Sequence, residues 1–345
     1  MQLKINAPFK NKDEVLPLIE AGADELYCGY LAPYWKRRFT DLEFERKGGG
    51  SNFEDLKELE KAVKLAHSRN IPVAATLNGL YVANQYPALI RVVKELSSLG
   101  IDAFIVADLG LLLWLKEKGC LQKIHISTGG TVFNSESCVF YKQFGINRVV
   151  LDRQTSFASM KELCQDNPDI EFEVFILNTL CVYIDGFCTF MHAYSFHSEQ
   201  VKAVSNPETK INLGLSYNCR SSADACCLNY TIKVYDQKKK RVCPRSKIRP
   251  VFFKHLIDCI ECGACALYDI SQTGVYAVKI VGRQFEPQKH IEDTRFISQS
   301  LAILKNNPGI LKLDFLAKVQ ELYRKTYNYA KTCQGNNCYF PEVLL

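Results

Sequence analysis

The sequence lacks the long hydrophobic stretches that cross membranes. No run approaches the roughly 18 uncharged apolar residues that suggest a spanning helix, and the start, Met1 to Asn6, lacks the apolar run of a signal peptide. We therefore expect a cytoplasmic protein with no membrane span. Thiols stay reduced in that compartment, so its cysteines are not expected to form structural disulfides.

Several catalytic signatures are also missing. The chain has no His-Glu-x-x-His helix, no Gly-x-Ser-x-Gly turn after a strand and no Walker-type phosphate loop. Gly48-Gly49-Gly50 lacks the Lys and Ser/Thr that follow the glycines of a phosphate loop, so we interpret it as a flexible loop or a lid beside the site. No nucleophile–base pair can be read from the sequence.

Charge of one sign is not in large excess. The 345 residues include 43 Lys+Arg and 37 Asp+Glu, a formal net charge of +6 spread along the chain. The basic run 238–241 follows the β-prone residues 231–235, which predicts a solvated hairpin turn; contact with nucleic acid is the other reading. With 47% hydrophobic residues, the chain can bury a large core, which excludes disordered and collagen-like classes.

Short β-prone segments alternate with amphipathic helical stretches, such as 53–70, about every 25 residues, as in a parallel sheet. Glycine turns that would end a helix precede several strands, as at Gly22, Gly100, Gly145 and Gly274. Further helices are expected at about 290–305 and 312–331. The expected strands are Leu3–Ala7, Glu25–Cys28, Val73–Leu77, Ala103–Ala107, Lys123–Ser127, Arg148–Leu151, Glu171–Leu177 and Ala277–Ile280.

Eight βα units favour a (β/α)8 TIM-barrel-like fold over an open doubly wound sheet, although periodicity alone leaves the open sheet as an alternative. We expect one barrel domain over 1–345. A Cys-rich insertion, 181–265, would lie between strands 7 and 8, and 310–345 would form a C-terminal helical tail with cysteines. The insertion would then start at the C-terminal face of the barrel, where active sites of this architecture are built.

Polar residues follow most of the expected strands, so in a barrel they would meet around one opening. We select Asp152, Arg153, Asn78 and Arg283 as candidate catalytic or substrate-binding residues; Asp152 and Arg153 would either pair with each other or bind substrate. Asp108 and Asn134 precede helical segments and are interpreted as helix caps. The other polar strand ends are Asn6, Thr76, Asn78, Ser127, Thr128 and Asn178.

The 15 cysteines are unevenly distributed, and nine of them lie between 181 and 265. Cys120, Cys138 and Cys164 stand alone in amphipathic segments and are predicted to be packing residues, whereas Cys28 near a strand end is left open. Cys259-x-x-Cys262-x-x-Cys265 has the spacing of iron–sulfur ligands, with zinc as the alternative metal. A second set of four thiols consists of Cys181, Cys188, Cys226 (or Cys227) and Cys243.

These motifs resemble the peptidase U32 family, in particular its short members that assist oxygen-independent ubiquinone hydroxylation and its RNA-hydroxylation proteins. The match covers about residues 3–285. It rests on Asn178 to Cys181, the stretch ending at Cys188, Ala225-Cys226, Val242-Cys243, Ala75 to Asn78, Val106 to Gly110, Ile126 to Thr128, Val150 to Arg153 and Val278 to Arg283.

The resemblance implies a barrel-like fold and a [4Fe-4S] cluster held by Cys181, Cys188, Cys226 and Cys243. Some family members place a cysteine before the Lys-Ile-Glu-Gly-Arg motif, which here is Cys262, so the fourth ligand is either Cys243 or Cys262. Two positions depart from the family pattern, because Val281 replaces the Glu of that motif and Cys227-Leu228 replaces a Cys-Arg pair. Both departures weaken a transfer of substrate or catalytic role.

Cysteines beyond the family pattern suggest a second cluster. Cys259 and Cys265 are the additional thiols, and Cys219, Cys333 or Cys338 would complete the set. All seven candidate metal ligands are therefore Cys181, Cys188, Cys226, Cys243, Cys259, Cys262 and Cys265.

Our first functional hypothesis is an oxygen-independent, hydroxylation-type modification of a small molecule, an RNA or a peptide by an iron–sulfur enzyme. A peptidase acting on a modified peptide is the first alternative. The second is a non-catalytic, cluster-bearing subunit, because short relatives work as heterodimers. A homodimer or heterodimer is therefore among the expected assemblies.

Overall fold

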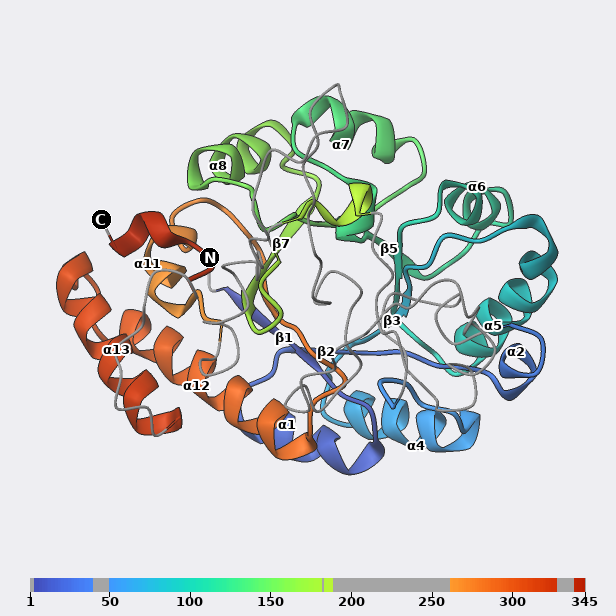
Figure 1. Cartoon of the computed structure of the whole chain (residues 1–345), viewed down its shortest axis with the longest axis horizontal. Coiled ribbons are helices and arrows are strands. Elements are labelled where there is room, and N and C mark those ends of the chain that lie inside the picture. Colours follow the sequence, from blue (N-terminus) through green and yellow to red (C-terminus); the bar gives the residue numbers. More distant parts are fainter. Residues whose placement is uncertain (1–2, 40–49, 182, 189–260, 328–337, 345) are drawn as a thin grey trace, which may run out of the picture.

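The computed structural model describes residues 3–39, 50–181, 183–188, 261–327 and 338–344. Eight parallel strands form a closed barrel in chain order, with β8 paired to β1 (Figure 1). The predicted (β/α)8 barrel is confirmed, and the open sheet is wrong. The strands are β1 (Lys4–Pro8), β2 (Glu25–Cys28), β3 (Val73–Leu77), β4 (Ala103–Val106), β5 (Lys123–Ile126), β6 (Arg148–Val150), β7 (Glu171–Leu177) and β8 (Ala277–Ile280).

Helices surround the barrel, and α12 and α13 lie side by side next to α11 at one edge (Figure 1). The helices are α1 (Val15–Glu20), α2 (Pro33–Lys36), α4 (Leu56–His67), α5 (Tyr86–Ser98), α6 (Leu109–Glu117), α7 (Ser135–Lys142), α8 (Phe157–Asp166), α11 (Leu267–Ile270), α12 (Pro287–Asn306) and α13 (Lys312–Tyr327). Short 3-10 turns include η1 (Lys12–Glu14), η2 (Ala83–Gln85), η3 (Thr128–Gly130), η4 (Asp185–Phe187), η6 (Ala264–Ala266) and η8 (Pro341–Leu344).

The connection from β7 to β8 contains the predicted Cys-rich insertion. Residues 182 and 189–260 of that connection lie outside the described residues, as do Gly48, Gly49 and the basic run 238–241. The division into barrel, insertion and tail therefore stays a prediction.

Local sequence explains where helices begin and end. Helix α4 starts after Asp55, whose carboxylate accepts a hydrogen bond from the backbone N–H of Lys57, so it is shorter than the predicted 53–70. The four predicted turn glycines, Gly22, Gly100, Gly145 and Gly274, all have positive φ. An L-residue there costs roughly 1–2 kcal/mol, which explains why glycine ends these helices before the strands.

The barrel interior near the amino-terminal strand ends is charged, whereas such barrels are usually filled with branched aliphatic side chains. This interior charge cluster consists of Glu25, Arg148, Glu171, Glu173 and Lys279. Glu173 is fully buried and accepts hydrogen bonds from Lys279 Nζ at 2.7 Å and Arg148 Nη1 at 2.8 Å. Arg148 also contacts Glu25 at 2.5 Å and Glu171 at 2.7 Å.

Opposite charges decide the ionisation of this cluster. Burial alone would raise the pKa of Glu173, but the cations of Lys279 and Arg148 lower it well below its usual range. Burial also lowers the pKa of Lys279, although Glu173 opposes this shift. His125 from β5 is enclosed beside the cluster, and burial together with the positive charge of Arg148 lowers its pKa. His125 is therefore neutral at pH 7.

Candidate functional site

The carboxyl ends of the strands form the face that we call the mouth. Two predicted helix caps on this face are confirmed. Asp108 accepts a hydrogen bond from the backbone N–H of Leu111 at 2.7 Å, and Asn134 accepts one from Ser137 at 2.9 Å. Asp108 also accepts a 2.5 Å hydrogen bond from the Tyr86 hydroxyl. Both residues are thus committed to local structure.

Asp152 and Arg153 lie together after β6, but a third residue joins them. Turn η4 places Asp185 so that its backbone N–H donates to Asp152 Oδ2 at 3.0 Å. Its carboxylate accepts from Arg153 Nη1 at 3.0 Å and from Thr128 Oγ1 at 2.5 Å. Asp185 was not selected from the sequence, and it is the residue that fixes this group.

The turn η4 needs a glycine to approach the loop after β5. A Cβ on Gly186 would lie 2.3 Å from Thr131 Oγ1 and 2.7 Å from the carbonyl oxygen of Gly129. The second contact is with backbone, which cannot easily move aside. Gly186 therefore allows Asp185 to reach Asp152 and Arg153.

Three polar atoms of predicted site residues are buried without a hydrogen-bond partner among the described residues: Asp152 Oδ1, Arg153 Nε and Asn78 Oδ1. Buried polar atoms are almost always paired in native structures, so such exceptions mark places where a ligand or water binds. Burial, followed by the negative charge of Asp185, raises the pKa of Asp152 above its ordinary value.

Tyr339 completes the surroundings of Arg153. The guanidinium donates to the Tyr339 oxygen, and the Tyr339 hydroxyl donates to the backbone carbonyl of Asn178. Burial alone would lower the pKa of Arg153, but Tyr339, Asp185 and Cys181 raise it above its ordinary value. The Arg153 guanidinium also lies 4.3 Å from the centre of the Phe175 ring. Its position is thus fixed from several sides.

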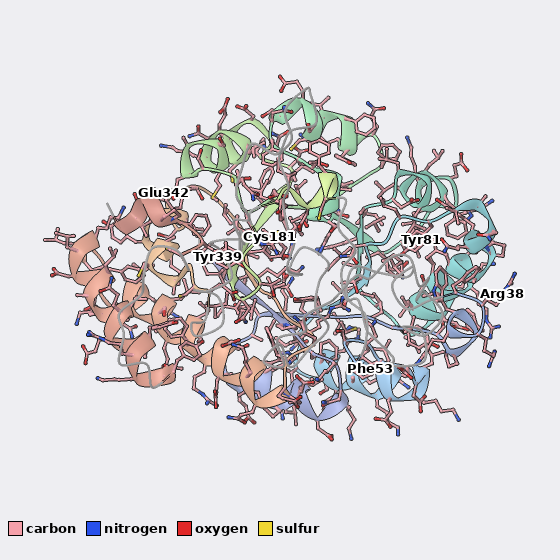
Figure 2. The ribbon with its side chains drawn as sticks, viewed as in Figure 1. Arg38, Phe53, Tyr81, Cys181, Tyr339 and Glu342 are labelled. Carbon is pink, nitrogen blue, oxygen red and sulfur yellow. The ribbon has the colours of Figure 1, made fainter. Side chains whose placement is uncertain are left out.

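Tyr339 was missed because the final residues were interpreted as a tail. Only the neighbouring Cys338 singled out this segment in the sequence. In the structure, Tyr339 and Cys181 both lie toward the β7 side of the barrel (Figure 2).

Arg283 follows β8 and is directed to a different partner. Its Nη1 donates to Asn52 Oδ1 at 2.8 Å, and Gly29 leaves the space in which this contact forms. The Arg283 guanidinium lies 6.0 Å from the centre of the Tyr27 ring. The catalytic roles of Arg283, Asn78, Asp152 and Arg153 remain predictions.

An unusual backbone turn leads into the first cysteines. Asn178 and Thr179 both have positive φ, 64° and 53°, which is costly for residues other than glycine. The turn is held by Glu261, whose backbone carbonyl accepts from Asn178 N–H and whose side chain accepts from Thr179 N–H. Asn178 Nδ2 also donates to Asp293 at 2.7 Å. The two ends of the insertion are thereby joined.

Cys181 and Cys188 lie on this mouth segment and are the two described members of the first predicted cluster set. The backbone N–H of Tyr183 lies 3.4 Å from Cys181 Sγ, and Cys181 contributes to the electrostatic environment of Arg153. Hydrogen-bond donors and a cation beside sulfur favour thiolates, which is what a cluster requires. The surroundings of Cys181 therefore suit a cluster ligand, and Cys188 follows turn η4 of the same segment. Cys226, Cys227, Cys243 and Cys259 lie outside the described residues.

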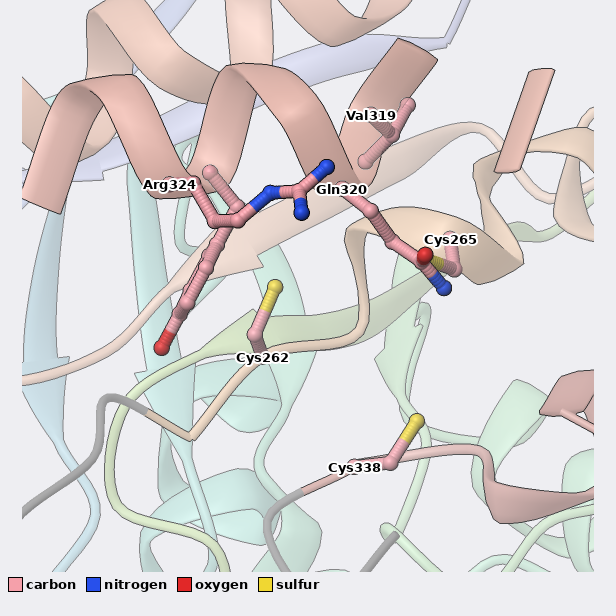
Figure 3. Close-up of a pocket in the computed structure, with 7 residues that line it drawn as sticks. Cys262, Cys265, Val319, Gln320, Arg324 and Cys338 are labelled. Atoms are coloured by element: carbon pink, nitrogen blue, oxygen red, sulfur yellow. The ribbon is translucent and has the colours of Figure 1, made fainter. Parts of the chain in front are cut away.

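A second group of thiols lies behind the end of β7. Cys262, Cys265 and Cys338 line one pocket with Val319, Gln320, Tyr323 and Arg324 of α13 (Figure 3). In the part of the chain that the structure describes, no three His, Cys, Asp or Glu side chains are arranged so that they could hold a single metal ion.

The cysteines that were predicted to pack do so. Cys138 is fully buried, while Cys120 and Cys164 are half-buried against the core. Burial raises the pKa of Cys138 to about 11 and that of Cys164 to about 11, so neither thiol is reactive. Cys28, which was left open, is buried in β2.

The fold and the site define the class: this is a (β/α)8 barrel protein with polar and thiol groups at the carboxyl ends of its strands, where such barrels place their active sites. The profile of peptidase family U32 matches residues 10–335. The chain therefore belongs to this family, as its motifs predicted.

Named relatives differ in what they are said to do. "Uncharacterized protease MJ0090" of Methanocaldococcus jannaschii is 32% identical over 52% of this chain and 41% of its own length. "tRNA hydroxylation protein P" of Escherichia coli is 29% identical over 48% of this chain and 34% of its own. "23S rRNA 5-hydroxycytidine C2501 synthase" of Escherichia coli is 26% identical over 82% of this chain and 36% of its own. The chain spans less than half the length of these relatives.

No helix within the described ranges is long and apolar enough to cross a membrane.

Proposed function

We propose that this protein hydroxylates a nucleotide of RNA at the mouth of the barrel. The observation that carries the proposal is the pair of buried, unpartnered atoms, Asp152 Oδ1 and Arg153 Nε, beside Cys181. One is an acceptor when ionised and the other a donor, which matches the mixed donors and acceptors on the edge of a nucleobase.

Exposed aromatic side chains at the mouth support an RNA ligand. Phe187 is 73% exposed and Tyr183 is 44% exposed, and both lie between Cys181 and Cys188. Proteins that bind unpaired RNA stack bases on such rings, at roughly 1–3 kcal/mol per base. A base stacked there would lie next to the segment that carries the proposed cluster ligands.

The two cysteines would hold a [4Fe-4S] cluster with two further thiols. Cys226 or Cys227 is the proposed third ligand, and Cys243 or Cys262 is the fourth. Replacing C–H by C–OH adds one oxygen atom and removes two electrons, so an oxygen-independent reaction needs an oxygen-atom donor other than O2 and an external electron acceptor. The cluster, when bound, would carry electrons one at a time toward that acceptor.

The side chains of the mouth have roles that do not depend on the cluster. Arg153, held by Asp185 and Tyr339, would bind and orient the base. Asp152 has a raised pKa and would hold a proton at Oδ1 or accept one from the ligand. Asp185 positions both residues, because its backbone N–H donates to Asp152 and its carboxylate accepts from Arg153.

The names of two relatives also support RNA hydroxylation, one for tRNA and one for 23S rRNA. We propose a cytoplasmic location, where such RNAs occur. A second subunit, either another copy or a related chain, is a further proposal that follows from the resemblance to short family members that work as heterodimers.

The test is nucleoside mass spectrometry of total RNA from cells that lack the gene and from cells that regain it. We expect one nucleoside in the complemented cells to have gained a single oxygen atom, and Cys181→Ala to abolish this gain. Cys138→Ala, a buried packing cysteine, is the control and should retain it. Identical RNA in both strains, with peptide cleavage that persists after iron removal, would favour the peptidase alternative.

A further inference from the structure

Helix α12 brings two buried polar residues to the mouth. The helix follows β8, so it starts at the carboxyl ends of the strands. His290 and Asp293 lie near this start and share one face of the helix, because residues three apart in a helix are neighbours. Both are fully buried. Burying such groups is costly unless they are well paired, so their partners show what the helix holds in place.

His290 fixes the start of α12 to the barrel. Its Nε2 lies 3.0 Å from the carbonyl oxygen of Gly282, and a carbonyl oxygen can only accept, so Nε2 donates to it. Its Nδ1 lies 2.5 Å from Glu14 Oε2. Glu14 Oε1 accepts from the backbone N–H groups of Lys10 and Asn11, both at 3.1 Å. The start of the helix is thus tied to the loops that follow β8 and β1.

Asp293 reaches the turn that follows β7. Its Oδ2 accepts from Asn178 Nδ2 at 2.7 Å and from Lys289 Nζ at 2.8 Å. Its Oδ1 accepts from the Tyr327 hydroxyl of α13 at 2.7 Å and from Lys289 Nζ at 3.1 Å. Hydrogen bonds to an ionised carboxylate are stronger than neutral ones. The carboxylate is therefore held from three sides, and it holds the Asn178 side chain in turn.

Asn178 connects Asp293 to Arg153. Asn178 has a φ of 64°, a conformation that persists in residues other than glycine only where the surroundings fix it. Its carbonyl oxygen accepts from the Tyr339 hydroxyl, and the Tyr339 oxygen accepts from the Arg153 guanidinium. A chain of hydrogen bonds therefore runs from α12 through the turn to the side chain that would bind the base.

We propose that Asp293 is a positioning residue of the mouth: it holds the Asn178 turn and, through Tyr339, sets the place of the Arg153 guanidinium. This role rests on the proposed function, because Arg153 is the base-binding residue of that site. Asp293 is fully buried behind the turn and acts through Asn178, not on the base itself.

The test compares two variants of the full chain with a matched control. Asp293→Asn replaces one acceptor oxygen with an amide that faces donors. Asn178→Gly keeps the positive-φ turn, which glycine adopts readily, but removes the amide that reaches Asp293. The control is Ser300→Ala, a buried serine of α12 whose hydroxyl donates to the Phe296 carbonyl within the helix. Hydrogen exchange followed by mass spectrometry reports local opening, and nucleoside mass spectrometry of RNA from complemented cells reports modification.

We expect the backbone amides of Asn178 and Thr179 to exchange about tenfold faster in both variants, while the amides of α5 keep their rates. RNA modification should fall roughly tenfold in each, because a small misplacement of Arg153 is enough to slow the reaction. The double variant should be no worse than Asn178→Gly alone, since Asp293 acts through that residue. Ser300→Ala should match the unaltered protein in every measurement.

Exchange of Asn178 and Thr179 at the unaltered rate in both variants would overturn this role and leave the proposed function standing. Faster exchange that includes α5 would overturn it too, because Asp293 would then support overall stability. So would losses of modification that add in the double variant. Absence of the modified nucleoside from cells with the unaltered protein would instead contradict the proposed function, and with it the role of Asp293.

Discussion

The two ends of the barrel treat buried charge in opposite ways. At the amino-terminal end, Glu173 is fully buried, and its carboxylate is matched by Lys279 and Arg148. At the mouth, Asp152 is buried and the Arg153 side chain is 5% exposed, yet each keeps an atom without a partner among the described residues. An unpaired buried polar atom costs about 1–3 kcal/mol, so the first arrangement serves stability, and we propose that a ligand pairs with the atoms of the second.

The largest effect is expected from breaking the interior charge cluster. Glu173→Gln removes the carboxylate that pairs with the buried Lys279 and leaves Arg148 with Glu25 and Glu171 alone. We expect the free energy of unfolding to fall by about 3–5 kcal/mol, measured by urea denaturation. Asp169→Asn, which breaks an exposed pair with Lys142, is the control and should cost no more than about 1 kcal/mol. Equal losses in both variants would contradict this view of the cluster.

A substitution at the mouth should affect activity more than stability. Asp152→Asn removes a carboxylate whose ionisation is disfavoured by burial, so the free energy of unfolding should change by less than about 1 kcal/mol. RNA modification should fall about 100-fold if Asp152 transfers a proton. Quantitative nucleoside mass spectrometry measures the decrease in RNA modification. If the Asp152→Asn variant modifies RNA at the normal rate, Asp152 is not a catalytic residue of the site.

Acid should weaken the amino-terminal end in two stages. The pKa of His125 is lowered in the folded protein, so the unfolded chain binds that proton more readily and stability falls below about pH 6.5. The pKa of Glu173 is also lowered, so its contribution is complete above about pH 4.3 and is lost as the pH falls further. Urea denaturation from pH 8 to pH 3 measures both stages. His125→Leu should remove the first stage only. If the pH dependence of stability is the same in this variant, His125 does not cause the first stage.

The smallest effect is expected at Tyr339. Tyr339→Phe removes the hydroxyl that links Arg153 to the Asn178 carbonyl, at a cost of about 1 kcal/mol in unfolding free energy. Modification should decrease several-fold through misplacement of Arg153, while iron content stays unchanged. Loss of iron in this variant would mean that Tyr339 supports the thiols instead.

Local signals made the barrel predictable. Gly22 and Gly274 end helices in a conformation that glycine adopts readily, and mostly apolar strands such as Val73–Leu77 are recognisable in the sequence as buried. Asp108 was predicted as a helix cap because capping involves neighbouring residues. Glu173, an acidic residue within a hydrophobic strand, was a visible signal of the interior charge cluster that was not used.

Long-range contacts could not be predicted in the same way. Asp185 lies in the loop after β7 and contacts Asp152 after β6, and Tyr339 reaches Arg153 from the C-terminal segment. Cys338 was one of three proposed companions for the second thiol set, and it pairs with Cys262 in a β-bridge, whereas Cys219 and Cys333 lie outside the described residues. Pairings of this kind depend on how the closed barrel brings its loops together.

The most direct test of the account is photochemical cross-linking of RNA to the intact protein, followed by mass spectrometry to locate the attached residues. We predict cross-links at Tyr183 and Phe187, on the mouth beside Cys181, and their loss when Arg153 is changed to Ala. Cross-links confined to the outer helices, unchanged by Arg153→Ala, would contradict the claim that the mouth binds RNA.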